Sequence, residues 1–517
     1  MIQIVMFSTL INWVWSRSVL LLILLLSASA NAQIQQSARL EIPLEGNDHS
    51  GYRVVSAQQF GLVIYRSIDT PEGPKIELSR LDTALHEVWH GFIGTDKKLQ
   101  LLYAQVHENI LSLLLKGANY ASGDFLIINI RLEKGNYTTH LVKNAIPFNP
   151  TQYVVTSTAA LIGGYFNYRP LAVYFNFTQQ QSKILPGFFN EPGELDQMSL
   201  NPDGSIDIIV SAKNFEHKKC LWIRNYDSEG SLSKTVVVTP EDKKNLIFAR
   251  SVQSAQGEQI VCGVYGRYAD YSRGVFVAVI NAMGEYTVRY YNFADLHNFF
   301  KYMKASRERR ILSRIQRRKI KGKKTRFNYR MMVHDLIPYN NQFVMLGEAF
   351  YPHYSYANRS YGGLSTFSRY NSNPIMREGM VFDGYQYTHA VVIGFDTNGK
   401  LIWDNSFEVN DVRTMQLEQF VKIQAERERI ILLYLHENIL RSKIIKGSEV
   451  IEGKSEDNLM PQVASGKVKV KDIENSRLDY WYNQYFFAFG IQSIKTTPSA
   501  GIANTRKVFF INKITYK

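Results

Sequence analysis

Cysteine is scarce in this sequence of 517 residues, which contains only Cys220 and Cys262. Two cysteines cannot form the dense set of disulfides that stabilises small secreted domains, so a disulfide scaffold is excluded. The strand pattern described below places them on neighbouring sheets, where a disulfide between them is one alternative in an oxidising compartment. We favour two separate buried thiols, because free cysteine is one of the most frequently buried residue types.

The apolar segment near the N-terminus is too short to anchor the protein in a membrane. Residues 19–26 are apolar, whereas a helix that spans a bilayer needs about 20 such residues. Arg17 precedes this segment, and Ala30 and Ala32 follow it with the spacing of a signal-peptidase site. The sequence therefore predicts a signal peptide over residues 1–32 and an exported protein, periplasmic or associated with the outer membrane, with secretion as the alternative.

Familiar catalytic motifs are missing as well. The sequence has no Gly-x-Ser-x-Gly elbow, phosphate-binding loop or dinucleotide-binding glycine motif. Residues 86–90 read His-Glu-Val-Trp-His and match the metallopeptidase pattern, which requires a helix to bring both imidazoles to one zinc ion. This segment aligns instead with the strand at 400–404, where His86 and His90 would lie about 13 Å apart. We therefore expect no metal site and no peptidase activity.

Short apolar segments with turn signals between them recur along the chain, with a period of about 45–60 residues, which predicts repeated β-sheets. The clearest hairpin covers residues 391–403, with Gly399 at the turn, and further hairpins occur at 276–290 and 221–238. The pattern predicts an all-β chain in which residues 33–517 form a single β-propeller of about eight four-stranded blades.

Seven blades are counted between residues 51 and 457, and the C-terminal region 478–516 supplies three further strands. We predict that the isolated strand at 38–44 completes this last blade, since such closure removes an exposed sheet edge. A propeller of seven blades is the alternative.

The hairpin turn also carries a resemblance to a known family. Residues 395–403 read Phe-Asp-Thr-Asn-Gly-Lys-Leu-Ile-Trp and resemble the repeat of PQQ-like or WD40-like propellers, and the segment from Leu81 to Trp89 is a poorer copy. Residues 327–412 are similar to exported propellers of unassigned function in Bacteroidota. Enzymes of the PQQ class hold a quinone with calcium, often near adjacent cysteines. Cys220 and Cys262 are not adjacent, so no cofactor is expected.

Two insertions interrupt the predicted propeller. Residues 292–326 form a basic insertion with helical character and Asp295 as its predicted N-cap. Between Lys301 and Arg326 it contains thirteen Lys or Arg residues and one acid, so it supplies most of the formal net charge of +14. Residues 350–385 are rich in Tyr, Ser, Asn and Gly and are predicted to form a long loop on one face, a composition typical of adaptable recognition surfaces.

These insertions contain the candidate binding residues. In the basic insertion they are Arg309, Arg310, Arg314, Arg317, Arg318, Lys319, Lys321, Lys323 and Lys324. In the loop they are Tyr351, His353, Tyr354, Tyr356 and Tyr361. Arginine offers paired hydrogen bonds to phosphates and carboxylates, so an anionic partner is expected.

The sequence predicts a non-catalytic binding or scaffold protein of the bacterial cell envelope. Its expected partner is an envelope protein, an anionic lipid, a lipopolysaccharide or a glycan. Nucleic acid would fit the same charge, but export argues against it. One alternative is a glycan-binding protein or a glycoside-active enzyme with carboxylates dispersed over several blades. Another alternative is that the basic insertion is a solvated charge run with no partner.

Overall fold

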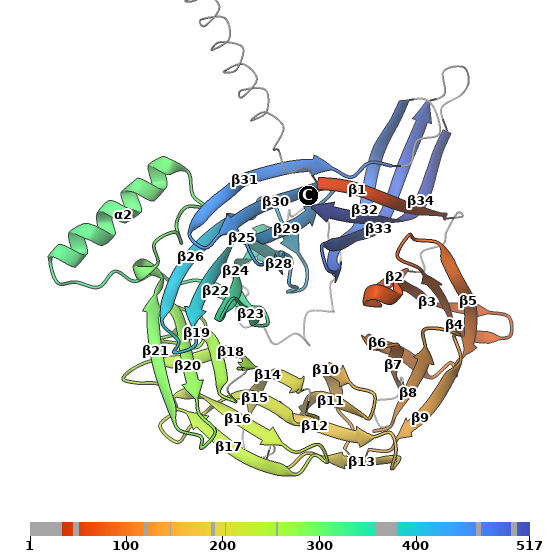
Figure 1. Cartoon of the computed structure of the whole chain (residues 1–517), viewed down its shortest axis with the longest axis horizontal. Helices are drawn as coiled ribbons and strands as arrows, with labels where there is room; N and C mark the ends of the chain where they lie inside the picture. The colour runs from red at the N-terminus through yellow and green to blue at the C-terminus, as the bar shows by residue number, and fades with distance from the viewer. Residues whose placement is uncertain are drawn as a thin grey trace, which may run out of the picture.

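Eight antiparallel sheets stand around a common centre in the computed structural model of the chain (Figure 1). The prediction of an eight-bladed β-propeller is confirmed, and the alternative of seven blades is wrong. The structure describes residues 34–44, 51–117, 123–144, 146–187, 192–201, 203–254, 257–356, 380–461, 467–497 and 504–516. The predicted signal peptide, residues 1–32, lies outside the described residues.

The blades are numbered in chain order, and the strands of each are given from the innermost to the outermost. Blade 1 contains β2 (Arg53–Ser56), β3 (Leu62–Thr70), β4 (Gly73–Leu81) and β5 (Glu87–Gly94), with η1 (Gln58–Phe60) between the first two. Blade 2 contains β6 (Leu99–His107), β7 (Ile110–Gly117), β8 (Phe125–Arg131) and β9 (Tyr137–Val142). Blade 3 contains β10 (Asn149–Val155), β11 (Ala159–Phe166), β12 (Arg169–Asn176) and β13 (Gln181–Ile184). Blade 4 contains β14 (Gly193–Leu200), β15 (Ile206–Lys213), β16 (Lys219–Tyr226) and β17 (Leu232–Val238).

The second half of the ring follows the same order. Blade 5 contains β18 (Asn245–Gln253), β19 (Gln259–Gly266), β20 (Gly274–Ile280) and β21 (Tyr286–Asn292), after which come η2 (Phe293–Asp295) and α2 (Ala305–Ile320). Blade 6 contains β22 (Arg330–Val333), β24 (Gln342–Tyr356), β25 (Met380–Asp396) and β26 (Leu401–Glu408). It also contains β23 (Ile337–Tyr339), which pairs with β24, and β27 (Arg413–Thr414), which pairs with β25. Blade 7 contains β28 (Lys422–Ala425), β29 (Ile430–His436), β30 (Ile439–Lys446) and β31 (Glu449–Asn458). Blade 8 contains β32 (Lys467–Tyr482), β33 (Tyr485–Thr497), β34 (Asn504–Tyr516) and β1 (Ile34–Pro43).

The hydrophobic core is divided into eight clusters, and each cluster joins two adjacent blades. One cluster packs Leu62 of blade 1 against Phe487 of blade 8, and another packs Cys262 of blade 5 against Phe343 of blade 6. The second strands are buried on both faces, as in β19, where all eight residues are buried. Outer strands such as β9 are largely exposed. Stacked blades require this difference, because only the outermost strand has a wet side.

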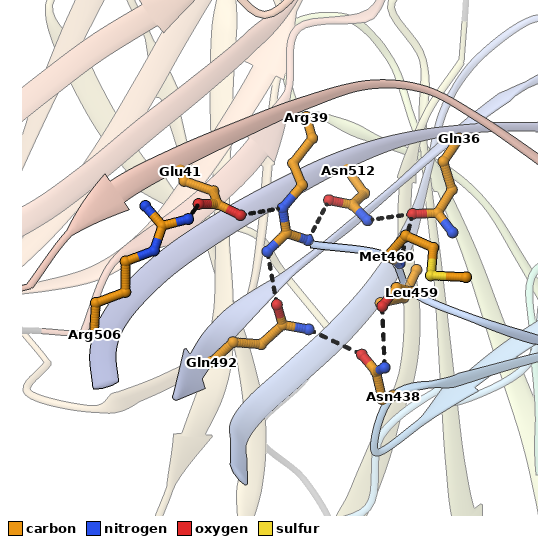
Figure 2. A network of polar contacts seen from close by, with 9 residues as sticks. All are labelled: Gln36, Arg39, Glu41, Asn438, Leu459, Met460, Gln492, Arg506 and Asn512. Carbon is orange, nitrogen blue, oxygen red and sulfur yellow. Dashed lines mark hydrogen bonds and ion pairs between the residues drawn. The ribbon is translucent and has the colours of Figure 1, made fainter. Parts of the chain in front are cut away.

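Strand β1 closes the ring as the sequence predicts, since it pairs antiparallel with β34 at the outer edge of blade 8. A buried polar network fixes it there (Figure 2). The Arg39 side chain is 8% exposed and donates to Glu41 at 2.7 Å, to Asn512 of β34 at 2.8 Å and to Gln492 of β33 at 2.6 Å. One guanidinium group therefore links three strands of blade 8.

The same network reaches blade 7 through two amide side chains. The Oε1 atom of Gln36 accepts hydrogen bonds from the Asn512 side chain at 2.7 Å and from the Met460 backbone N–H at 3.0 Å. The Gln492 side chain donates to Asn438 at 2.9 Å. The first described strand is thus held both to the last strand and to the neighbouring blade (Figure 2).

The metallopeptidase-like segment is a strand, as expected. Residues 87–90 lie in β5, and His86 precedes it. The His90 ring lies 3.0 Å from Glu77, whereas His86 faces Asp82 at 3.6 Å, so the two imidazoles have different partners. The predicted alignment of Trp89 with Trp403 also holds, because both lie in outermost strands and each indole packs on a turn glycine of the following blade.

Both cysteines are buried free thiols on neighbouring blades, with Cys220 in β16 and Cys262 in β19. The disulfide alternative is therefore wrong. Burial raises the pKa of each thiol, which disfavours the reactive thiolate.

We expect an aromatic disulfide reagent to leave both cysteines of the native protein unmodified, because both thiols are fully buried and neither ionises readily. The same reagent should titrate two thiols per chain in guanidinium chloride. Absorbance of the released thiolate measures both numbers. Failure to titrate thiols after denaturation would show a disulfide instead.

Candidate anion-binding cleft

Both insertions lie on the same face of the ring. Strands within each blade alternate in direction, so the loops between second and third strands and the connections between blades emerge at one end. We call this end the connecting face, and the end with the remaining turns the opposite face. The basic insertion connects blade 5 to blade 6, and the Tyr-rich segment joins β24 to β25. Both therefore belong to the connecting face.

The basic insertion starts with a segment that is part of the propeller core. Phe299 and Phe300 are fully buried. The Asp404 carboxylate of β26 accepts hydrogen bonds from the backbone N–H groups of His297 at 2.8 Å and Asn298 at 2.6 Å. The Asn298 side chain returns a hydrogen bond to the Asp404 carbonyl at 2.7 Å. The base of the insertion is therefore rigidly attached to the outer strand of blade 6.

An enclosed histidine supports this base from the other side. Tyr302 stacks on the His389 ring of β25 with centroids 3.7 Å apart and an angle of 4° between the planes. Phe299 and Tyr329 approach the same ring edge-on. Burial lowers the pKa of His389 to about 3, so the imidazole is neutral at physiological pH.

The helix begins later than predicted. Asp295 lies in η2, whose N-cap is Asn292, and α2 begins at Ala305 after Lys304, which makes no side-chain cap. The prediction of Asp295 as N-cap is therefore wrong, because the apolar residues that follow it fill the core instead of starting a helix. Ile311 and Ile315 pack against the core cluster of blades 5 and 6.

Figure 1 shows α2 projecting outward from the ring. Most of the predicted basic residues on and after it are exposed, and Arg318 is half-buried. Basic side chains in the last turn, among them Arg317 and Lys319, complement the negative end of the helix dipole. The basic residues of the last turn therefore favour the helical conformation.

A cleft of about 860 Å³ lies between the end of α2 and the connecting face of blade 5. Four of its basic residues come from the insertion, namely Lys319, Lys323, Lys324 and Arg326. Five more come from blade 5 and its connection to blade 4, namely Lys243, Lys244, Arg267, Arg273 and Arg289. Among the described residues that line this cleft, only Glu241 and Asp295 are acidic.

The positive charge in this cleft is partly uncompensated. Among the described residues, no carboxylate lies within ion-pair distance of Arg267, Arg273 or Arg326. Burial and the nearby charges of Arg326 and Arg267 lower the pKa of Arg273. Lys244 is different, because it pairs with Asp242 at 3.2 Å. A phosphate, sulfate or carboxylate entering this cleft would relieve repulsion between the arginines.

The Tyr-rich segment is more regular than predicted. Residues 350–356 and 380–385 extend the ladder of β24 and β25, so the prediction of a loop over the whole of 350–385 is wrong. Tyr351 is exposed, and the Tyr354 ring meets Phe382 edge-on. His353 lies 3.3 Å from Asp383, which also pairs with Arg413. Tyr361 and the side chain of Tyr356 lie outside the described residues.

Two exposed carboxylates beside the inner strands of blades 7 and 8 are paired with basic side chains. Glu418 lies 3.7 Å from Arg477, and Asp479 lies 3.2 Å from Lys422. Asp196 is fully buried between blades 4 and 5, where burial raises its pKa to about 8 and the Ala249 backbone N–H donates to it at 3.0 Å.

The described part of the chain contains no group of three or more His, Cys, Asp or Glu side chains placed to hold a metal ion. No helix there is both long and apolar enough to cross a bilayer.

No family model and no curated protein matches this chain. Among solved structures, it is similar to the polysaccharide lyase Uly1, at 10% identity over 80% of this chain and 89% of that chain, with a TM-score of 0.39. It is also similar to the β-propeller domain of the Trilobed protease from Pyrococcus furiosus, at 9% identity over 79% and 95%, with a TM-score of 0.36. The WD40 domain of SCAP from fission yeast gives 7% identity over 93% and 98%, with a TM-score of 0.33.

Only the half of the cleft that belongs to the basic insertion is predictable from the sequence pattern. Lys319, Lys323 and Lys324 were candidates, whereas Arg267 and Arg273 were not, because they are isolated basic residues far away in the sequence. Their position in the loop between β19 and β20 is the signal that could have found them. Once blades are aligned, that loop must face the connection that carries the insertion.

Proposed function

We propose that this protein is a non-catalytic binding protein that works outside the cytoplasm, at the bacterial cell envelope, and captures an anionic partner. The observation that carries this proposal is the cleft, in which basic side chains from two separate parts of the chain face one space with little acid to balance them. Binding an anion there would replace like-charge repulsion with charge-assisted hydrogen bonds.

A role in binding agrees with the way the site is built. The base of the insertion is fixed by Asp404 and by the aromatic contacts of Phe299, and Ile311 and Ile315 pack helix α2 against the core. A support that is held in place before binding reduces the entropy lost when a ligand binds. The predicted PQQ-like relationship and the envelope location are part of this proposal.

The test is binding of fluorescently labelled inorganic polyphosphate to a variant in which Lys319, Lys323, Lys324 and Arg326 are changed to Gln. We expect the affinity to fall by about tenfold or more and the remaining affinity to depend less on salt, because fewer ionic contacts are left. Titrations at two NaCl concentrations measure both effects. The helix should stay folded, since none of the four side chains is in the core.

The matched control removes the charge of four exposed lysines in blades 1 and 2 and their connections, as Lys97→Gln, Lys98→Gln, Lys134→Gln and Lys143→Gln. This variant should bind polyphosphate like the wild type. If both variants lost the same affinity for polyphosphate, net charge alone would attract the polyanion and the proposed site would be wrong. Deleting residues 296–326 is not a suitable test, because Phe299 and Phe300 belong to the core.

A further inference from the structure

Three consecutive blades present exposed aromatic side chains at the tips of their connecting-face loops. Tyr168 stands between β11 and β12, Phe215 between β15 and β16, and Tyr268 between β19 and β20. Their exposed fractions are 81%, 94% and 62%. Water is an unfavourable environment for a large apolar side chain, and a row of them on one face marks a surface for binding.

The backbone at these tips does not need the aromatic residues. Asn167 and Tyr168 form a two-residue turn with φ values of 49° and 62°, a conformation that favours glycine and is rare for a bulky residue. At the next tip, the Asn214 side chain accepts hydrogen bonds from the Glu216 and Lys218 backbone N–H groups at 3.0 Å, so Phe215 is not required to form the turn. A bulky residue kept in an unfavourable backbone conformation, as Tyr168 is, indicates a functional requirement.

The opposite face lacks such aromatic tips in its corresponding described turns. The turns between first and second strands read Glu-Asn at 108–109, Thr-Ser-Thr at 156–158, Asn-Asn at 340–341 and Asn-Gln at 483–484. Exposed aromatic tips are therefore a property of the connecting face, where the basic insertion also lies. Helix α2 adds an exposed Ile320 beside its arginines and lysines.

We propose that the connecting face docks on an anionic phospholipid bilayer, with the aromatic tips of blades 3 to 5 in the headgroup layer and the basic helix and cleft on lipid phosphates. This deepens the proposed function and rests on it, because it names the anionic partner. Aromatic rings favour the membrane interface, and clustered Lys and Arg are attracted to anionic lipids. Neither contribution requires a segment that spans the membrane.

The test is cosedimentation of the full protein with vesicles of phosphatidylcholine and phosphatidylglycerol, with pure phosphatidylcholine vesicles for comparison. We expect binding to the mixed vesicles only. The variant with Tyr168→Gly, Phe215→Ser and Tyr268→Ser should lose about tenfold or more of its vesicle affinity and keep its polyphosphate affinity. Tyr168→Gly should not destabilise the fold, since glycine suits the positive φ.

A matched control changes three exposed apolar residues outside the connecting face, as Tyr137→Ser, Leu232→Ser and Met283→Ser. This control should bind vesicles like the wild type. If the aromatic variant binds mixed vesicles undiminished, or the wild type binds pure phosphatidylcholine equally well, membrane docking is overturned while the proposed function stands. Binding of polyphosphate or a soluble acidic polysaccharide without binding of mixed vesicles also overturns it. Failure of the proposed function itself would appear separately, as unchanged polyphosphate binding by the cleft variant.

Discussion

Replacing Arg39 with alanine is expected to lower the free energy of unfolding by about 3–5 kcal/mol, the typical cost of removing one partner from a buried charged network. In the native protein, three acceptors surround this guanidinium, on Glu41, Gln492 and Asn512. Gln492 and Asn512 are fully buried. Without Arg39, their oxygen atoms lose a charged donor in a place that water does not readily reach.

Arg506→Ala is the matched control for this prediction. Arg506 also pairs with Glu41, at 2.6 Å, but its side chain is 45% exposed. Water can replace it, so we expect a loss of about 1 kcal/mol or less. Urea unfolding followed by tryptophan fluorescence measures both variants, and Trp481, between blades 8 and 1, reports on ring closure. Equal midpoints for the two variants would show that Arg39 does not hold β1 in place.

Acidification from pH 7.5 to pH 4.5 is expected to cost the wild type about 2–3 kcal/mol of stability more than a His389→Phe variant. The folded protein holds the pKa of His389 at about 3, below the ordinary value of 6.5. As the pH falls through 6.5, His389 becomes protonated in the unfolded chain but stays neutral in the folded protein. The contribution of the neutral His389 to the free energy of unfolding is therefore fully present above pH 6.5. It is lost as the pH falls towards 3.

Phenylalanine suits this site because the His389 ring lies among aromatic rings, stacked on Tyr302 and met edge-on by Phe299 and Tyr329. The substitution gives up the contact of His389 Nδ1 with the Thr388 hydroxyl at 3.0 Å. Urea unfolding at both pH values measures the difference.

A His86→Gln variant is the control for this pH dependence, because His86 is largely exposed. It should follow the wild type at both pH values. A His389→Phe protein with the same pH dependence as the wild type would refute the assignment.

Sequence alone predicted the number of blades and the ring closure because each rests on local patterns. Apolar runs bounded by turns mark the inner strands, and the segment at 38–44 had no neighbouring strand to pair with, so it was assigned to the last blade. The structure places β1 there, from Ile34 to Pro43. The alignment of Trp89 with Trp403 also identified residues 87–90 as a strand.

Other features depend on contacts that the sequence does not display. Asp295 followed the ordinary pattern of an N-cap, but Phe299 and Phe300 were needed in the core, which delayed the start of the helix. Tyrosine, serine and asparagine around 351–356 indicated a loop, yet pairing with residues 380–385 extends the hairpin. The cleft combines residues far apart in the chain. The basic residues that blade 5 contributes are therefore recognised only from the three-dimensional arrangement of the blades.

Ring closure has a consequence for how this protein is made. Ile34 pairs with Tyr516, so β1, which is synthesised before the other described strands, can pair only after β34 has been synthesised. Until then β1 has no strand to pair with, and the face of blade 1 that packs against blade 8 lacks its contacts with Phe487 and Trp481. The ring can therefore close only after β34 is available, and removal of β34 would leave β1 and β33 with edges open to pairing with other chains.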